Sequence, residues 1–317
     1  MQQASEVDNL TIIDSKNHWL DKGFTWLVWI FAGCTVLLLF WMSWIIFDKA
    51  MPAISKFGLG FLWSQEWDVG NLVFGALPYI YGTVVSSAIA ILLAFPVGLA
   101  VAIVTSENFL PSVVRSPIAF TIELIAAIPS VIIGLWGIFV LIPFLDPFQQ
   151  WLYQSFGWFP LFSSQPAGYG MLVAGLILAI MILPTMAAIS REVLLAIPKE
   201  LRSGSMSLGA TRWETIFGVI IPAAASGIVG AAILALGRAL GETMAVTLVI
   251  GNSPVISASI LDLGYTIPAV MANEFGEAQD DLHVGALMYL ALILFVVTLL
   301  VNMAAVLMVR LIGSKQQ

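Results

Sequence analysis

The sequence predicts an all-α integral membrane protein with six transmembrane helices. Hydrophobic residues make up 60% of the 317-residue chain and charged residues only 10%, whereas a soluble domain carries about 25% charged residues. Six apolar segments are also long enough to cross about 30 Å of hydrocarbon at about 1.5 Å per residue. These segments run from Phe24 to Phe47, Tyr81 to Val104, Ile118 to Ile142, Tyr169 to Ile189, Gly227 to Ile250 and Val284 to Val309.

The remaining composition excludes several classes of protein. A net charge of −7 argues against a nucleic-acid binder, which needs a basic face. The single cysteine, Cys34, builds neither a disulfide framework nor a cysteine metal site, and His18 and His283 are too far apart in sequence to suggest a histidine-rich metal site. The first span follows a polar stretch and shows no cleavage pattern before Asp48, so we expect it to remain as an anchor.

The distribution of lysine and arginine predicts that both termini are cytoplasmic. With the N-terminus inside, nine of these residues fall on inside segments and two fall outside, while Arg238 stays in the membrane. The inside set is Lys16, Lys22, Arg115, Arg191, Lys199, Arg202, Arg212, Arg310 and Lys315, and the outside set is Lys49 and Lys56. The expected organisation is a cytoplasmic segment 1–23, a first helix 24–47, an outside loop 48–80, a five-helix core 81–309 and a cytoplasmic tail 310–317.

Two long outside loops, 48–80 and 143–168, are rich in aromatic residues such as Trp67 and Trp158. Tryptophan and tyrosine concentrate where membrane meets water, so an interfacial belt is one interpretation. A docking surface for an external partner is the other, and the two are compatible.

Arg238 and Glu242 are charged residues within an apolar stretch. An arginine at membrane depth costs about 2.5–3.5 kcal/mol on insertion scales, so it is kept for a partner, a watery cavity or a task. In a continuous helix, residues four apart share a face. We therefore predict a polar face on an anion path, with Thr243 as an additional hydroxyl on the same helix. The alternative is a structural ion pair that fixes helix packing, and the nearby Gly237 and Gly241 suggest close packing.

Glu123 is a further charge within the third predicted span. Pro129 interrupts the helical hydrogen bonds six residues later, which suggests a hinge or gate on the same path. The alternatives are an ion pair with Arg238 or a carboxylate that reaches water at the cytoplasmic end.

The cytoplasmic loop 190–222 predicts two short amphipathic helices that meet at Gly209. Pro198 and Pro222 bracket them, and Thr211 is placed to cap the second helix. Such a knob fits a groove on a soluble partner. It could equally be a helical hairpin lying on lipid headgroups.

The run Leu208-Gly209-Ala210, followed by Ile220-Ile221-Pro222, resembles the coupling loop of ABC importer permeases. Ser203 stands where that family carries a glutamate, which weakens the case for a specific acidic contact and leaves the helix–glycine–helix geometry intact. The resemblance implies that Ser203, Leu208, Gly209, Ala210 and Trp213 couple the chain to an ATPase.

Longer blocks resemble one branch of that family, the C-type membrane subunit of the phosphate-specific (Pst) ABC importer. They are GALPYIYGTVVSS from Gly75, IELIAAIPSVIIGLWGIF from Ile122, LGRALGETMAVTLVIGN from Leu236, and ANEFGEA from Ala272 with LHVGALMYLALILFVVT after it. The resemblance implies a type I importer architecture in the bacterial inner membrane, a related A-type permease, two ATPase subunits and an external phosphate-binding protein. It implies a transport subunit that is no enzyme and binds no cofactor, with ATP and Mg on the partner ATPase. The sequence agrees, because it has no phosphate-binding G-x-x-x-x-G-K-[ST] run.

The anion chemistry fits this resemblance, because the arginine fork donates two parallel hydrogen bonds to phosphate. Other interpretations stay open: a permease for sulfate or molybdate, or a proton-coupled carrier that uses Glu123 and Glu242. A membrane hydrolase is a weaker match, since no histidine lies well within a span to act as a base.

Overall fold

Helix α6 (Met171–Ala196) forms the centre of the computed structural model and packs along α2 (Leu77–Ser106) and α9 (Ile221–Gly241). Apart from Thr185, Ser190, Arg191 and Glu192, its residues are apolar on every side, as expected of a helix surrounded by others, and Ile177 and Ile182 are fully buried. The structure describes residues 2–107 and 109–313, with side chains from 22 to 307 except those at 108, 112 and 305. Lys16, His18, Arg310 and Lys315 therefore lie outside the described side chains.

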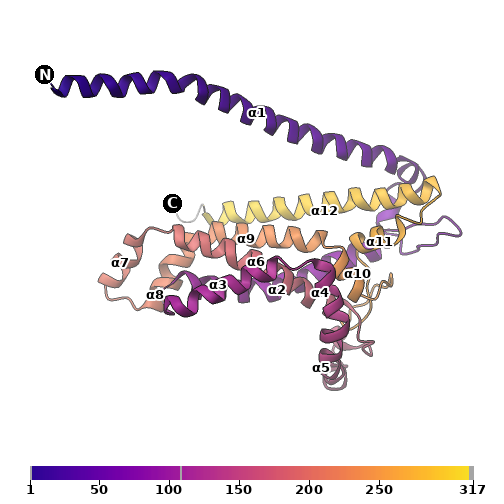
Figure 1. Ribbon diagram of the computed structural model, residues 1–317. Helices are drawn as coiled ribbons and strands as arrows, with labels where there is room; N and C mark the ends of the chain where they lie inside the picture. The colour runs from indigo at the N-terminus through magenta and orange to yellow at the C-terminus, as the bar shows by residue number, and fades with distance from the viewer. Residues whose placement is uncertain (1, 108, 314–317) are drawn as a thin grey trace.

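Helices α1 (Gln2–Phe57) and α12 (Asp281–Gly313) form a second pair at the side of the bundle. They approach each other at the outer end of α1, whereas the rest of α1 diverges from the bundle (Figure 1). Side chains between 24 and 47 are mostly exposed, and burial begins at Ala50 and Ala53. A long apolar helix with this exposure needs lipid or another membrane protein around it.

A small aromatic core closes the end of the molecule where α1 meets α12. It is built by η1 (Gly58–Leu62), the following loop and α11 (Ile267–Glu274), which pack on α2 and α12. Trp67 donates through Nε1 to Glu274 at 2.9 Å, and His283 Nε2 lies 2.9 Å from the same carboxylate oxygen. These contacts hold the outside loop to α11 and α12.

The predicted third span is divided in the structure. Helix α3 (Ser112–Ala126) ends before Pro129, and a new helix, α4 (Ser130–Trp136), starts after it, so the proline break expected from the sequence is confirmed. A π-helical turn, η2 (Gly137–Leu141), leads into α5 (Ile142–Phe156). Helix α5 turns away from the bundle (Figure 1), and η3 (Pro160–Phe162) follows it.

The knob is confirmed as two short helices, α7 (Lys199–Ser207) and α8 (Arg212–Thr215), before the π-helical turn η4 (Ile216–Ile220). It lies at the same end of the molecule as the beginning of α1 and the end of α12 (Figure 1).

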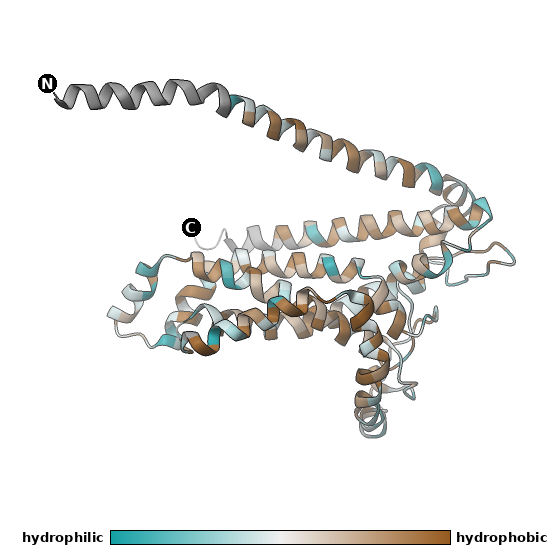
Figure 2. Cartoon of the chain, viewed as in Figure 1, coloured by the Kyte–Doolittle hydropathy of each residue, from teal (hydrophilic) through white to brown (hydrophobic). Residues whose placement is uncertain are grey.

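Within the described residues, six helical segments are long and apolar enough to span a membrane. Figure 2 shows the apolar colour along these helices and hydrophilic colour on the knob and the loops at the two ends. The predicted number of spans is therefore confirmed. Their ends differ from the prediction, because α1 continues to Phe57, inside the expected loop 48–80, and the expected fifth span is interrupted.

Candidate functional site

Arg238 lies on a face of α9 that no other part of the described chain covers. Its side chain is exposed, and a Cβ added at Gly230, Gly237 or Gly241 would meet no atom within 4 Å. These three glycines recur at helical spacing and so form one open face of α9, and Arg238 lies beside that face. No described part of this chain packs on Gly237 and Gly241, so the close packing expected there stays a prediction about a partner.

The prediction that one continuous helix carries both Arg238 and Glu242 is wrong. Helix α9 ends at Gly241, Glu242 has an extended backbone with φ −69° and ψ 126°, and α10 (Met244–Val249) begins after Thr243. The Glu242 carboxylate accepts from the backbone N–H of Ala245 at 3.3 Å, at the positive end of α10. This local cap and the low helix propensity of the adjacent Gly241 both favour a break between α9 and α10. Since the described ion pairs are Glu107–Arg202 and Glu274–His283, Arg238 and Glu242 do not form one.

Arg238 makes its described hydrogen bond to α6 instead. One terminal nitrogen donates to the hydroxyl of Thr185 at 3.3 Å. A guanidinium carries five N–H donors, so most of the fork is open toward the uncovered face. The hydroxyl of Thr243 donates to the carbonyl of Gly241 at 3.3 Å, which ties it to the helix end. Of the expected path residues, Arg238 is therefore best placed to hold an anion.

Glu123 lies nearer the knob than Arg238 does. It lines a cavity of about 40 Å³ between α2, α3 and α6, together with Thr105, Arg191 and Glu192. On α6, Thr185 and Arg191 are six residues apart, which corresponds to about 9 Å along the helix axis. The alternative of an ion pair between Glu123 and Arg238 is therefore wrong for this structure, while a gating role stays a prediction.

The bend of the knob is built as the sequence predicts. Gly209 has a φ of +90°, in the left-handed region that favours glycine. Thr211 begins α8 with a reciprocal cap: its hydroxyl accepts from the N–H of Glu214 at 3.3 Å, and the Glu214 carboxylate accepts from the N–H of Thr211 at 2.7 Å.

The tip of the knob is apolar and exposed. Leu208 is 91% exposed, Trp213 55% and Phe217 61%. Ser203, at the position of the absent glutamate, is exposed and bonds back to the carbonyl oxygens of Lys199 and Glu200 at 3.2 Å. Exposed apolar groups gathered on a polar turn are typical of a protein contact, and Ser203 adds no charge to it.

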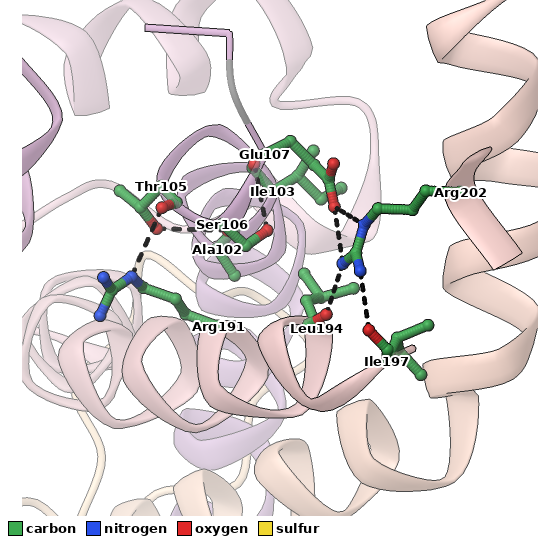
Figure 3. Close-up of polar contacts among 9 residues, drawn as sticks. All are labelled: Ala102, Ile103, Thr105, Ser106, Glu107, Arg191, Leu194, Ile197 and Arg202. Atoms are coloured by element: carbon green, nitrogen blue, oxygen red, sulfur yellow. Dashed lines mark hydrogen bonds and ion pairs between the residues drawn. The ribbon is translucent and has the colours of Figure 1, made fainter. Parts of the chain in front are cut away.

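One contact of the knob was not predicted from the sequence. Arg202 was expected only as one of the inside cations, yet it forms an ion pair with Glu107 at 3.1 Å (Figure 3). Glu107 is the acidic residue of the inside loop between the second and third spans. The negative charge of Glu107, opposite to that of the basic knob, was the one sequence feature that could have indicated this ion pair.

Comparisons with known proteins agree with these observations. The family described as "Binding-protein-dependent transport system inner membrane component" matches residues 94–316. A phosphate transport system permease protein, PstC, of Mesorhizobium japonicum is 44% identical over 300 residues, covering 93% of this chain and 89% of the relative. The PstC protein of Haemophilus influenzae is 40% identical over 306 residues, covering 95% and 94%.

Solved structures show the same fold at low sequence identity. A bacterial alginate ABC transporter aligns with a TM-score of 0.60 at 16% identity, covering 91% of this chain and 96% of that chain. The MetNI methionine ABC transporter in an inward-facing conformation aligns with a TM-score of 0.54 at 17% identity, covering 74% and 96%. At such identities the likeness concerns the fold alone.

Proposed function

Because this chain belongs to the family of inner membrane components of binding-protein-dependent transport systems, we propose that it is the C-type permease of an ATP-driven phosphate importer. It is a transport subunit and no enzyme, and its relatives of 40–44% identity are phosphate transport permeases. It forms one half of the path for phosphate delivered by an external binding protein. The observation that carries this proposal is the open guanidinium of Arg238 on the uncovered face of α9.

Arginine at this place suits the cargo. Hydrogen phosphate is a strongly hydrated anion, and its transfer through a low-dielectric path requires a positive group to offset the loss of water. The planar fork of Arg238 offers paired donors, and the bond to Thr185 orients it from one side. Glu242, beyond the end of α9, places a negative charge near the path that opposes permanent retention of the anion. Glu123, nearer the knob, is assigned to the gate.

The partners follow from the surfaces that this chain leaves open. We assign the small-residue face of α9 to contact with a related A-type permease, so that the two chains enclose the path. One of two ATPase subunits docks on the knob through Leu208, Gly209, Ala210 and Trp213, beside Ser203. ATP and Mg bind to the ATPase, and this chain holds no cofactor. The external phosphate-binding protein contacts the opposite end.

The orientation follows from the charge distribution. We assign the segment 1–23, the knob within the loop 190–222 and the tail 310–317 to the cytoplasm. The segments 48–80 and 143–168, which include the end of α1 and most of α5, are assigned to the outside of the bacterial inner membrane. The part of α1 from 24 to 47 is the anchor, and 81–309 is the transporter core. The knob shares one end of the molecule with the starting end of α1 and the far end of α12 (Figure 1), which supports this assignment.

Uptake of labelled phosphate tests the function directly. In cells that lack other phosphate importers, we expect this chain with its partners to restore uptake and the Arg238→Gln variant to abolish it while still inserting and assembling. Excess sulfate or molybdate is expected not to compete. Normal uptake by a well-expressed Arg238→Gln variant would refute the assigned path. Strong competition by sulfate or molybdate would show that the transported ion is another oxyanion.

A further inference from the structure

Arg202 joins three helices at the knob end of the molecule. From α7, its Nε and one terminal nitrogen donate to the Glu107 carboxylate, each at 3.1 Å. The terminal nitrogens also donate to the backbone carbonyl oxygens of Leu194 at 2.7 Å and Ile197 at 2.8 Å (Figure 3). One side chain thus connects α7 with the ends of α2 and α6.

The chemistry of this contact is specific for arginine. Carbonyl oxygens in the last turn of a helix lack partners inside the helix, and Arg202 supplies them at the end of α6. The Arg202 and Glu107 side chains are 18% and 17% exposed, so water competes weakly for the pair. A lysine has no planar fork, so it cannot make the same set of bonds from one position.

An aromatic contact from the second knob helix, α8, reaches the α2–α3 linker, which begins at Glu107. Phe109, two residues after Glu107, stacks on Trp213 with 4.9 Å between ring centroids, and Trp213 stacks in turn on Phe217. The two knob helices are also tied together, because the hydroxyls of Ser205 and Thr215 lie 3.0 Å apart. A displacement of the knob therefore acts on the α2–α3 linker through an ionic and an aromatic contact.

The linker leads directly into α3, which has a break at each end. Pro111 precedes α3 with an extended backbone at ψ 150°, and Pro129 follows it with ψ 137°. Short extended segments that flank a helix are suitable hinges. Helix α3 carries Glu123, the residue assigned to the gate, and much of its outer side is exposed in this chain.

We propose that Arg202 and Glu107 form the joint that transmits movement of the knob to α3, so that both act as positioning residues for coupling. The proposal rests on the proposed function, in which the knob docks the ATPase. The ATPase moves the knob, the joint moves the α2–α3 linker, and α3 swings between its hinges to open or close the path at Glu123. The joint contributes to transmission of the movement and not to ATPase docking.

The test uses the complete importer, purified and reconstituted in liposomes with the phosphate-binding protein. The variants are Arg202→Lys, which keeps the charge and loses the fork, and Glu107→Gln, which keeps the shape and loses the charge. Lys56→Arg is the matched control, because Lys56 donates to the carbonyl oxygen of Leu72 at the opposite end of the molecule. The measurements are ATPase co-purification, ATP hydrolysis, and phosphate transported per ATP.

We expect both variants to retain the ATPase and hydrolyse ATP while phosphate transported per ATP falls by about tenfold. That factor corresponds to about 1.4 kcal/mol, just below the range for a hydrogen bond to a charged group. Lys56→Arg is expected to match the unmodified importer. The charge exchange Glu107→Arg with Arg202→Glu is expected to recover only part of the ratio, because a glutamate cannot donate to the α6 carbonyl oxygens.

A thiol probe on α3 shows whether Arg202 and Glu107 transmit movement to α3 or only stabilise the fold. In a Cys34→Ser background, a cysteine in place of the exposed Thr121 is expected to change its reaction rate with a thiol reagent when the ATPase is trapped with vanadate. Arg202→Lys is expected to remove that change. An unaltered transport ratio and probe response in both variants would overturn the proposal, as would loss of ATPase binding in both. Failure of the unmodified chain to co-purify with the ATPase would instead refute the proposed function.

Discussion

Glu242 shows that a charge close in sequence to Arg238 has a separate structural task. Because α9 ends at Gly241, the two side chains leave different segments of the backbone, and the Glu242 carboxylate accepts from the N–H of Ala245 at the start of α10. Arg238 turns to Thr185 on α6. A change at Glu242 therefore acts on the start of α10 as well as on the charge near the path.

Two substitutions at Glu242 separate these effects. Glu242→Gln keeps an oxygen that accepts from Ala245, so we expect normal assembly and melting temperature but slower phosphate uptake through the lost charge. Glu242→Ala loses the cap too, at a cost of about 1 kcal/mol, and is expected to melt at a lower temperature. Uptake normalised to membrane expression measures the effect of the lost charge, and the melting temperature of the purified importer measures the effect of the lost cap. Equal uptake by Glu242→Gln and the unmodified chain would contradict the role of the charge.

The exchange Arg238→Glu with Glu242→Arg extends this test. Since the residues do not form an ion pair in the described structure, we expect the exchange to leave uptake near zero. Near-normal uptake by the exchanged variant would show that the two residues act as a structural pair and would refute the anion path.

At the scale of elements, the knob depends on one glycine for its bend. Gly209 adopts φ +90° between α7 and α8, whereas Gly204 lies within α7 with an ordinary helical backbone. A Cβ at either glycine would meet no atom within 4 Å. The two positions therefore differ in backbone conformation and not in available space.

Alanine at these two glycines tests the bend without adding bulk. Gly209→Ala is expected to strain the left-handed turn by about 1–2 kcal/mol, to distort the tip that carries Leu208, and to weaken ATPase co-purification. Gly204→Ala raises helix propensity and is expected to leave co-purification unchanged. If Gly209→Ala binds the ATPase as well as Gly204→Ala does, the bend is not required for docking.

At the scale of the whole molecule, one end carries the knob and the other carries the aromatic core around η1 and α11. Positively charged residues gather toward the knob end, since the outside segments contain only Lys49 and Lys56, both near the end of α1. Loops rich in lysine and arginine remain in the cytoplasm. This arrangement predicts that the ATPase reaches the knob end and that the phosphate-binding protein reaches the opposite end.

Cysteine labelling in a Cys34→Ser background measures this orientation. A cysteine replacing Ser163, an exposed residue beyond α5, is expected to react with a membrane-impermeant thiol reagent added outside intact cells. A cysteine replacing Ser207, exposed at the end of α7, is expected to react only in inside-out vesicles. The opposite pattern would invert the assigned topology.

The class of fold, the number of spans, the proline break before α4 and the glycine bend of the knob could all be predicted from the sequence alone. These features depend on local properties: apolar length against membrane thickness, the missing N–H of proline, and glycine's access to positive φ. The resemblance to phosphate permeases also rests on contiguous residues. Each feature is encoded within a short stretch and needs no knowledge of distant neighbours.

Contacts between distant segments were decided only by tertiary structure. Arg202 and Glu107 are 95 positions apart, and Arg238 and Thr185 are 53 apart, so neither pair is visible as a pattern along the chain. The end of α9 at Gly241 depends on a competition between continuing one helix and capping the next, a balance of about 1 kcal/mol that hydropathy does not report. The bilayer imposes helices and their length on the sequence, whereas the partner of each charge depends on which faces the folded helices bring together.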